Sequence, residues 1–97
     1  MKYKIYQITN YNDDCNYKFE WWDWAKDKFN LKKDYSVVYE GDVIPETDPI
    51  STLEKLFEIF NINHPADFRG HSLSVSDVVE LDGVKYYCDA QGWVEIE

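Results

Sequence analysis

The sequence predicts one α+β domain: a twisted, mainly antiparallel sheet of about five strands with two helices and a C-terminal β-meander. Three observations predict this class. Segments rich in β-formers occur together with two segments of helical periodicity. Leu81-Asp-Gly-Val84 is a strong hairpin signal. The chain of 97 residues has room for a single core, so we expect residues 1–97 to form one domain.

The N-terminal third predicts a strand and a helix. The strand is expected near residues 2–9, and apolar side chains on both of its faces favour a place inside the sheet. The helix is expected near residues 20–29, because Trp22, Ala25 and Phe29 recur with helical spacing.

A second strand is expected near residues 35–40, followed by a loop over 42–50. The next helix, near 51–60, is predicted from an apolar stripe and from Ser51 and Glu54, which have the spacing of a capping box. Pro65 is expected to open one short turn after this helix.

The C-terminal third predicts strands near 73–81, 84–89 and 93–96. A two-residue turn at Asp82-Gly83 fixes the register, so that Glu80 faces Lys85 and Val78 faces Tyr87. We expect both helices to cover one face of the sheet. The opposite face, where Val78 and Tyr87 pair, is then partly exposed or available for self-association.

The charge distribution excludes some partners. The net charge is −9, and residues 1–33 carry +2 (seven Lys, five acidic residues) whereas residues 34–97 carry −11 (three basic, fourteen acidic). Such a surface repels nucleic acid and anionic lipid, which leaves ordinary solubility or a partner protein with a basic surface. No apolar run has the length of a signal peptide or a membrane span, and Cys15 and Cys88 form no disulfide framework. A cytoplasmic protein with reduced thiols is expected.

Two groups of residues are candidates for binding a protein. The acidic residues are expected either to form one negative face or to be an ordinary solvated surface; they are Asp42, Glu46, Asp48, Glu54, Glu58, Asp82, Asp89, Glu95 and Glu97. The tryptophans are expected either to lie wholly or partly in the core or to include an exposed anchor for a partner; they are Trp21, Trp22 and Trp24.

Catalytic and metal-binding chemistry has little support. Asp77 falls on the apolar face of its predicted strand, so it is either a turn residue that accepts backbone N–H bonds or a buried acid with a raised pKa. His64 and His71 have no metal-ligand spacing, and no nucleophile elbow or phosphate-binding glycine loop is present. We expect no enzyme activity, no metal and no cofactor.

Several segments resemble the YodL-like domain of Firmicute bacteria. They are Tyr3-Lys-Ile-Tyr-Gln7, Tyr17-Lys-Phe-Glu20, Tyr35-Ser-Val-Val-Tyr39, Tyr86-Tyr-Cys-Asp89 with Gly92, and the long run Phe60-Asn-Ile-Asn-His-Pro-Ala-Asp-Phe-Arg-Gly-His-Ser-Leu-Ser-Val-Ser-Asp-Val-Val79. The resemblance implies a setting on phages, plasmids or conjugative elements, and supplies no catalytic residues. It gives turn and capping roles to the motif residues His64, Pro65, Asp67, Phe68, Gly70, Ser72, Ser76 and Asp77.

Three hypotheses about function follow. The first is a small acidic, non-enzymatic inhibitor of a host defence nuclease, an anti-CRISPR or antirestriction protein that occludes a basic nucleic-acid-binding cleft. The second is an accessory or regulatory domain that binds another protein of the host or the element. The third is an enzyme that works around Asp77 and His71, which requires the two side chains to converge in a pocket.

Overall fold

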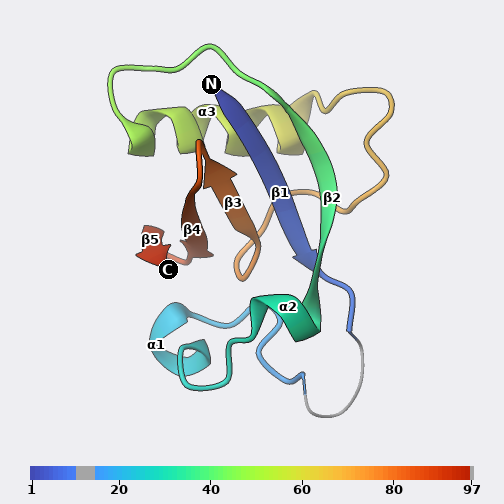
Figure 1. Ribbon diagram of the computed structural model, residues 1–97, viewed down its shortest axis with the longest axis vertical. Coiled ribbons are helices and arrows are strands. Elements are labelled where there is room, and N and C mark those ends of the chain that lie inside the picture. The colour runs from blue at the N-terminus through green and yellow to red at the C-terminus, as the bar shows by residue number, and fades with distance from the viewer. Residues whose placement is uncertain (11–14, 97) are drawn as a thin grey trace.

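The computed structural model describes residues 1–10 and 15–96 and confirms the α+β class (Figure 1). Its five strands are β1 (Lys2–Ile8), β2 (Tyr35–Asp42), β3 (Val78–Leu81), β4 (Val84–Asp89) and β5 (Gly92–Ile96). Its three helices are α1 (Trp22–Ala25), α2 (Leu31–Asp34) and α3 (Pro49–Ile62).

The strands form one antiparallel sheet in the order β2-β1-β3-β4-β5. β1 therefore lies between two neighbours, as its two apolar faces predict. The last three strands form the predicted meander. The pairing of β1 with β2 shifts by one residue between Ile5 and Tyr6, where β2 contains a bulge.

The β3–β4 hairpin has the predicted register. Glu80 faces Lys85, with an ion pair of 3.5 Å, and Val78 faces Tyr87. The two turn residues, Asp82 and Gly83, have φ values of 46° and 91°. Such positive φ values are what a two-residue hairpin requires, which is why the local sequence is sufficient to predict this turn.

The helices cover opposite faces of the sheet, which corrects the expectation that they share one face. Figure 1 shows α3 behind the strands near one end of the sheet and α1 and α2 near the other end. Leu53 and Phe60 of α3 pack on Ile5 and Val79 in one core cluster. Successive residues of a strand point to opposite faces, so Tyr6 and Val78, the neighbours of Ile5 and Val79, contact a second core cluster.

The second core cluster lies between the sheet and residues 15–35. It contains Ile8, Tyr17, Tyr35, Val78 and Tyr87. Val78 and Tyr87 are completely buried, so the expectation that this pair lies on an exposed face is wrong. The sequence does not predict that residues 15–35 cover this face, because most of these residues are irregular rather than helical.

The helix expected at 20–29 is shorter than predicted, and a separate helix follows it. α1 ends at Ala25, and its N-cap residue Trp21 makes no side-chain capping bond. Asn30 starts α2 instead, because its side chain accepts a hydrogen bond from the backbone of Lys33. The predicted inward face is confirmed, since Trp22, Ala25 and Phe29 all contact the second cluster.

α3 begins at Pro49 rather than at Ser51, and its cap is not the predicted capping box. Asp48 is the N-cap, and its Oδ1 accepts a hydrogen bond of 2.7 Å from the backbone N–H of Ser51. Pro49 occupies the first turn, where its missing N–H is not needed. The loop expected at 42–50 is shorter than predicted, because β2 continues through Gly41 to Asp42.

Candidate functional site

The strand expected at 73–81 begins only at Val78, because residues 74–77 form a tight turn. The backbone N–H of Asp77 donates to the carbonyl of Ser74 over 3.0 Å. In return, Oδ2 of Asp77 accepts a hydrogen bond of 2.9 Å from the backbone N–H of Ser74. The interpretation of Asp77 as a turn residue is therefore confirmed.

Asp77 is also the buried acid of the alternative interpretation. Only 1% of its surface is exposed, and burial raises the pKa of its carboxyl group to about 7. The hydrogen bonds from Ser74 and from Nε2 of Gln7 favour the ionised form but do not offset the cost of burial.

Gln7 of β1 connects Asp77 to His71. Its Nε2 donates to the carbonyl of His71 over 2.8 Å and to Oδ2 of Asp77 over 3.1 Å, and its Oε1 accepts from the backbone N–H of His71. Nδ1 of His71 lies 2.7 Å from the carbonyl of Ser72, so we assign the ring proton to Nδ1. The other ring nitrogen, Nε2, lies 3.8 Å from Oδ1 of Asp77.

The sequence analysis names Asp77 and His71 together only as a requirement of the enzyme hypothesis, and it missed Gln7 as the residue that links them. Gln7 is 64 residues from His71 and 70 from Asp77, so no local pattern announces the cluster. Asp77 is covered, whereas 35% of the His71 side chain is exposed. The Nε2 atom of His71 is nevertheless buried and has no hydrogen-bond partner among the described residues. Three hollows on the described surface are lined by other residues. The hydrogen bonds of Gln7 and Asp77 therefore hold the turn against β1.

The other motif residues make local turn and packing contacts. The backbone N–H of Phe68 donates to the carbonyl of Pro65, which gives the predicted short turn. Asp67 accepts a hydrogen bond from the hydroxyl of Tyr39. A Cβ at Gly70 would collide with Oε1 of Gln7, so glycine is needed where the chain passes β1.

Three exposed aromatic side chains follow one another closely in the segment before α1 and within it. Phe19, Trp21 and Trp24 are 56%, 60% and 49% exposed, and we call these three residues the aromatic patch. Trp22 differs, because its ring packs on Tyr87 with a centroid distance of 4.9 Å and on Phe29. The interpretation that all three tryptophans lie in or partly in the core is confirmed for Trp22, whereas Trp21 and Trp24 are exposed and Trp24 buries about half of its surface.

The backbone that carries the aromatic patch is fixed by hydrogen bonds to the sheet and to the motif turn. The N–H of Phe19 donates to Oγ of Ser76 over 2.9 Å, and the hydroxyl of Tyr87 donates to the carbonyl of Glu20 over 2.8 Å. The N–H of Trp22 donates to the side chain of Asp89. The exposed rings thus extend from an ordered support rather than from a free loop.

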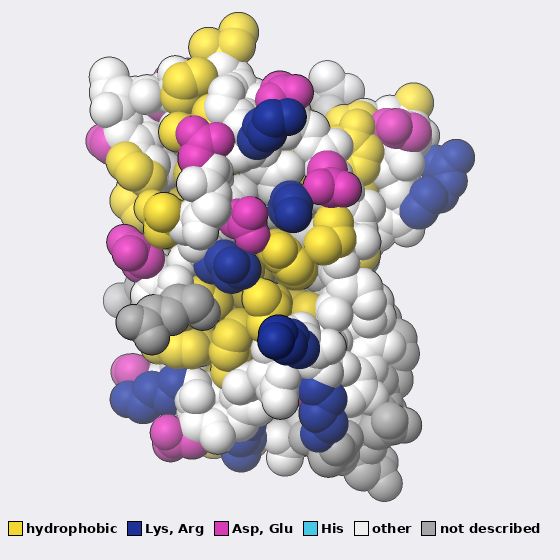
Figure 2. Space-filling model, in the orientation of Figure 1, with side chains coloured by type: hydrophobic (Ala, Val, Ile, Leu, Met, Phe, Trp, Pro, Cys, Tyr) yellow, Lys and Arg dark blue, Asp and Glu magenta, His cyan; other side chains and the backbone are white. Residues whose placement is uncertain are grey.

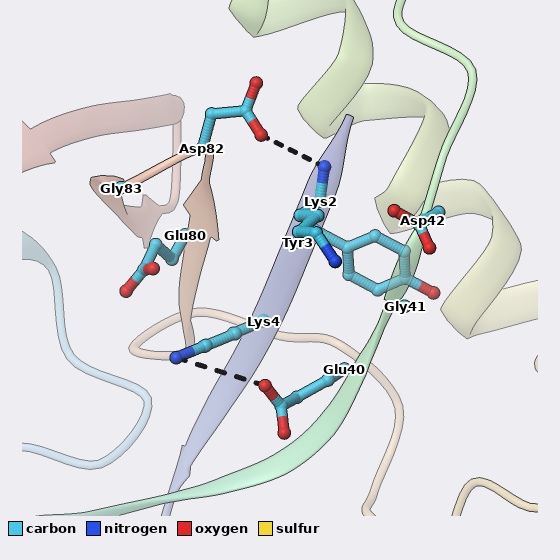
Figure 3. Close-up of a pocket in the computed structure, with 9 residues that line it drawn as sticks. All are labelled: Lys2, Tyr3, Lys4, Glu40, Gly41, Asp42, Glu80, Asp82 and Gly83. Atoms are coloured by element: carbon cyan, nitrogen blue, oxygen red, sulfur yellow. Dashed lines mark hydrogen bonds and ion pairs between the residues drawn. The ribbon is translucent and has the colours of Figure 1, made fainter.

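The acidic candidates are spread over separate places. Asp42 and Asp82 line a hollow at one end of the sheet together with Lys2 and Lys4 (Figure 3). Glu46, Glu54 and Glu58 line another hollow beside α3. Asp89 lies beside α1, Glu95 lies on β5 opposite Tyr86, and Glu97 falls outside the described residues.

Several of these acids already serve the fold. Asp48 caps α3, Asp82 accepts a bond from the backbone of Lys2, and Asp89 accepts from Trp22. Glu46 forms an ion pair of 3.4 Å with Lys55. Figure 2 shows acidic and basic side chains interspersed on the face turned to the viewer. On this face, the described acids therefore do not make one uninterrupted negative surface.

Residues 1–10 and 15–96 contain neither a group of metal ligands nor a membrane-spanning helix. Over these ranges, no three histidine, cysteine or acidic side chains are grouped so that they would hold a metal ion. Among the helices of the same ranges, none has the length and apolar character needed to cross a bilayer.

Comparison with known proteins addresses the family. The family model described as the YodL-like domain matches residues 2–97. This chain belongs to the YodL-like domain family. No curated protein and no solved structure matches it. Of the residues that carried the resemblance, Ser76 and Asp77 lie in the turn at residues 74–77, and Gln7 contacts both His71 and Asp77.

Proposed function

We propose that this YodL-like domain is a non-enzymatic protein-binding module and that the aromatic patch is its binding surface. The observation that carries the proposal is the exposure of Phe19, Trp21 and Trp24 on a backbone held by Ser76 and Tyr87. Large rings bury much apolar area for little loss of conformational entropy, and tryptophan is enriched among residues that dominate binding energy. A fixed backbone lowers the ordering cost of binding.

The proposed partner is a protein with a basic surface. The net charge of −9 steers such a partner toward the domain and disfavours direct binding to nucleic acid. Within this class we propose a nuclease of host defence, a CRISPR-associated or restriction enzyme, whose basic cleft the domain occludes. The setting is the cytoplasm of a bacterial host, with the gene carried by a phage or another mobile element.

A second candidate is an accessory or regulatory domain that binds another protein of the host or the element. The separation of Asp42 and Asp82 from Glu54 and Glu58 favours it, because imitation of a nucleic-acid backbone requires carboxylates in a row. Binding through the aromatic patch alone would depend little on salt.

Catalysis at His71 and Asp77 is the function that the geometry supports least. A general acid or base must reach a bound substrate, whereas Asp77 is buried and its carboxyl group is occupied by Ser74 and Gln7. The replacement Asp77→Asn is expected to leave the biological effect intact in any variant that stays folded.

The experiment is capture of partners by the tagged domain from a Firmicute lysate that contains CRISPR and restriction nucleases, at low and high salt, followed by mass spectrometry. Recovery of a nuclease that competing DNA or high salt releases supports defence inhibition. Recovery of another protein, with no effect of DNA, supports the accessory role. A second capture uses the domain with four charge reversals, Asp42, Glu46, Glu54 and Glu58 to Lys. If these reversals leave nuclease binding unchanged, occlusion by the acidic residues is wrong.

A further inference from the structure

A hollow lies within the segment that carries the aromatic patch. It is lined by Glu20, Trp21, Asp23 and Trp24, two residues with an indole ring and two with a carboxylate. Indole faces attract cations through the negative face of the ring, and carboxylates attract cations by charge. The hollow therefore combines the two groups that proteins use to bind a cationic side chain.

The chain itself places a cation on one of these rings. Nζ of Lys28 lies 3.1 Å from the centroid of the Trp24 ring, and Lys28 is not among the residues that line the hollow. Trp24 is 49% exposed even with this contact, so part of the indole surface stays accessible to a second group. The internal contact demonstrates that the position of Trp24 suits cation binding.

The two carboxylates are available to a ligand. Among the described residues, the side chain of Glu20 has no hydrogen bond or ion pair. Asp23 lies 3.8 Å from Nζ of Lys26, but both side chains are largely exposed. Exposed ion pairs of this kind contribute little to stability and exchange readily for another cation.

We propose that this hollow binds an arginine side chain on the basic surface of the partner protein. Arginine fits better than lysine, because its planar guanidinium stacks on an indole ring and at the same time donates two parallel hydrogen bonds to a carboxylate. This inference rests on the proposed function, and it names the group that the aromatic patch recognises.

The test uses a short arginine-containing peptide and the same peptide with citrulline, which is neutral and of nearly the same shape. The readout is the set of indole N–H signals of the ¹⁵N-labelled full chain. The arginine peptide, at millimolar concentration, is expected to shift the signals of Trp21 and Trp24 saturably. The signal of Trp93, whose indole faces Glu54 on the opposite side of the sheet, is expected to stay in place. The citrulline peptide is expected to shift none of them.

Variants sharpen the test. The double replacement of Glu20→Gln and Asp23→Asn is expected to weaken binding of the arginine peptide about fivefold. The reason is that neither side chain then carries a negative charge that attracts the guanidinium group. Lys28→Gln is expected to strengthen it about twofold, because a competing positive charge leaves Trp24. All three positions are on the surface, so the variants are expected to fold.

Equal shifts with the arginine and citrulline peptides would overturn the inference, as would the absence of any shift at Trp21 and Trp24. The proposed function is tested separately, by capture of a partner through the aromatic patch. Such capture without a response to the arginine peptide would leave the protein-binding role standing and remove arginine as the recognised group.

Discussion

The backbone N–H of Phe19 donates a hydrogen bond of 2.9 Å to Oγ of Ser76, and both residues have a left-handed backbone, with φ values of 68° and 81°. Neither residue is a glycine, so each conformation costs about 1 kcal/mol or more. Ser76 belongs to the motif turn and Phe19 to the aromatic patch. The turn at residues 74–77 thus fixes the backbone at Phe19, one of the exposed rings.

The replacement Ser76→Ala tests this coupling. It keeps the unfavourable backbone conformation and leaves the N–H of Phe19 without its acceptor, so we expect the free energy of unfolding to fall by about 1–2 kcal/mol. Ser76→Gly loses the same hydroxyl but relieves the strain, and its cost is expected to be smaller. Urea denaturation of the two variants provides the measurement. An alanine variant as stable as the wild type would show that the bond contributes nothing.

The pH dependence of stability tests the burial of Asp77. Its folded pKa of about 7 lies above its ordinary value of 3.8, so the folded chain binds the proton more tightly than the unfolded chain does. Its stabilising contribution is therefore fully present below the ordinary pKa and is lost as the pH rises through the folded value.

Asp77→Asn removes this titration. We expect the wild type to lose stability relative to the asparagine variant between about pH 4 and pH 7, the interval between the unfolded and folded pKa values. Denaturation curves of both proteins across that interval give the difference between their free energies of unfolding. The contributions of all other titrating groups are nearly the same in the two proteins and largely cancel in this difference. A constant difference would contradict the raised pKa.

The start of α3 provides a matched pair of variants. Asp48→Ala removes the side chain that accepts the N–H of Ser51, and we expect the melting temperature to fall by roughly 5 °C. Ser51→Ala retains the backbone donor and is expected to change the melting temperature much less. Thermal unfolding followed by circular dichroism separates the two. A larger fall of the melting temperature in the Ser51 variant would instead support the capping box that the sequence predicts.

Features fixed by neighbouring residues were predictable from the sequence. The turn at Asp82 and Gly83 set the β3–β4 register because positive φ is a local requirement. The stripe that includes Leu53, Leu56 and Phe60 predicted the buried side of α3, since it spans more than two helical turns.

Features that depend on distant contacts were not predictable. The segment after Glu20 is only marginally helical, so tertiary contacts and the cap at Asn30 decide where its helices begin and end. Trp22 packs on Tyr87 of β4, a contact between residues far apart in the sequence. This contact turns Trp22 inward and leaves Trp21 and Trp24 exposed. His71 and Asp77 converge because Gln7 of β1 binds both.

The central claim is that the YodL-like domain binds a protein through the aromatic patch, and affinity for the captured partner tests it most directly. Two double variants are compared. One carries Trp21→Ala and Trp24→Ala; the other, a control, carries Ile44→Ala and Ile62→Ala and so loses exposed apolar side chains elsewhere on the surface. Isothermal titration calorimetry is expected to show a loss of at least tenfold for the tryptophan variant, because each exposed anchor contributes about 1 kcal/mol or more. The isoleucine control is expected to bind like the wild type. Equal affinity of the two variants would contradict the claim.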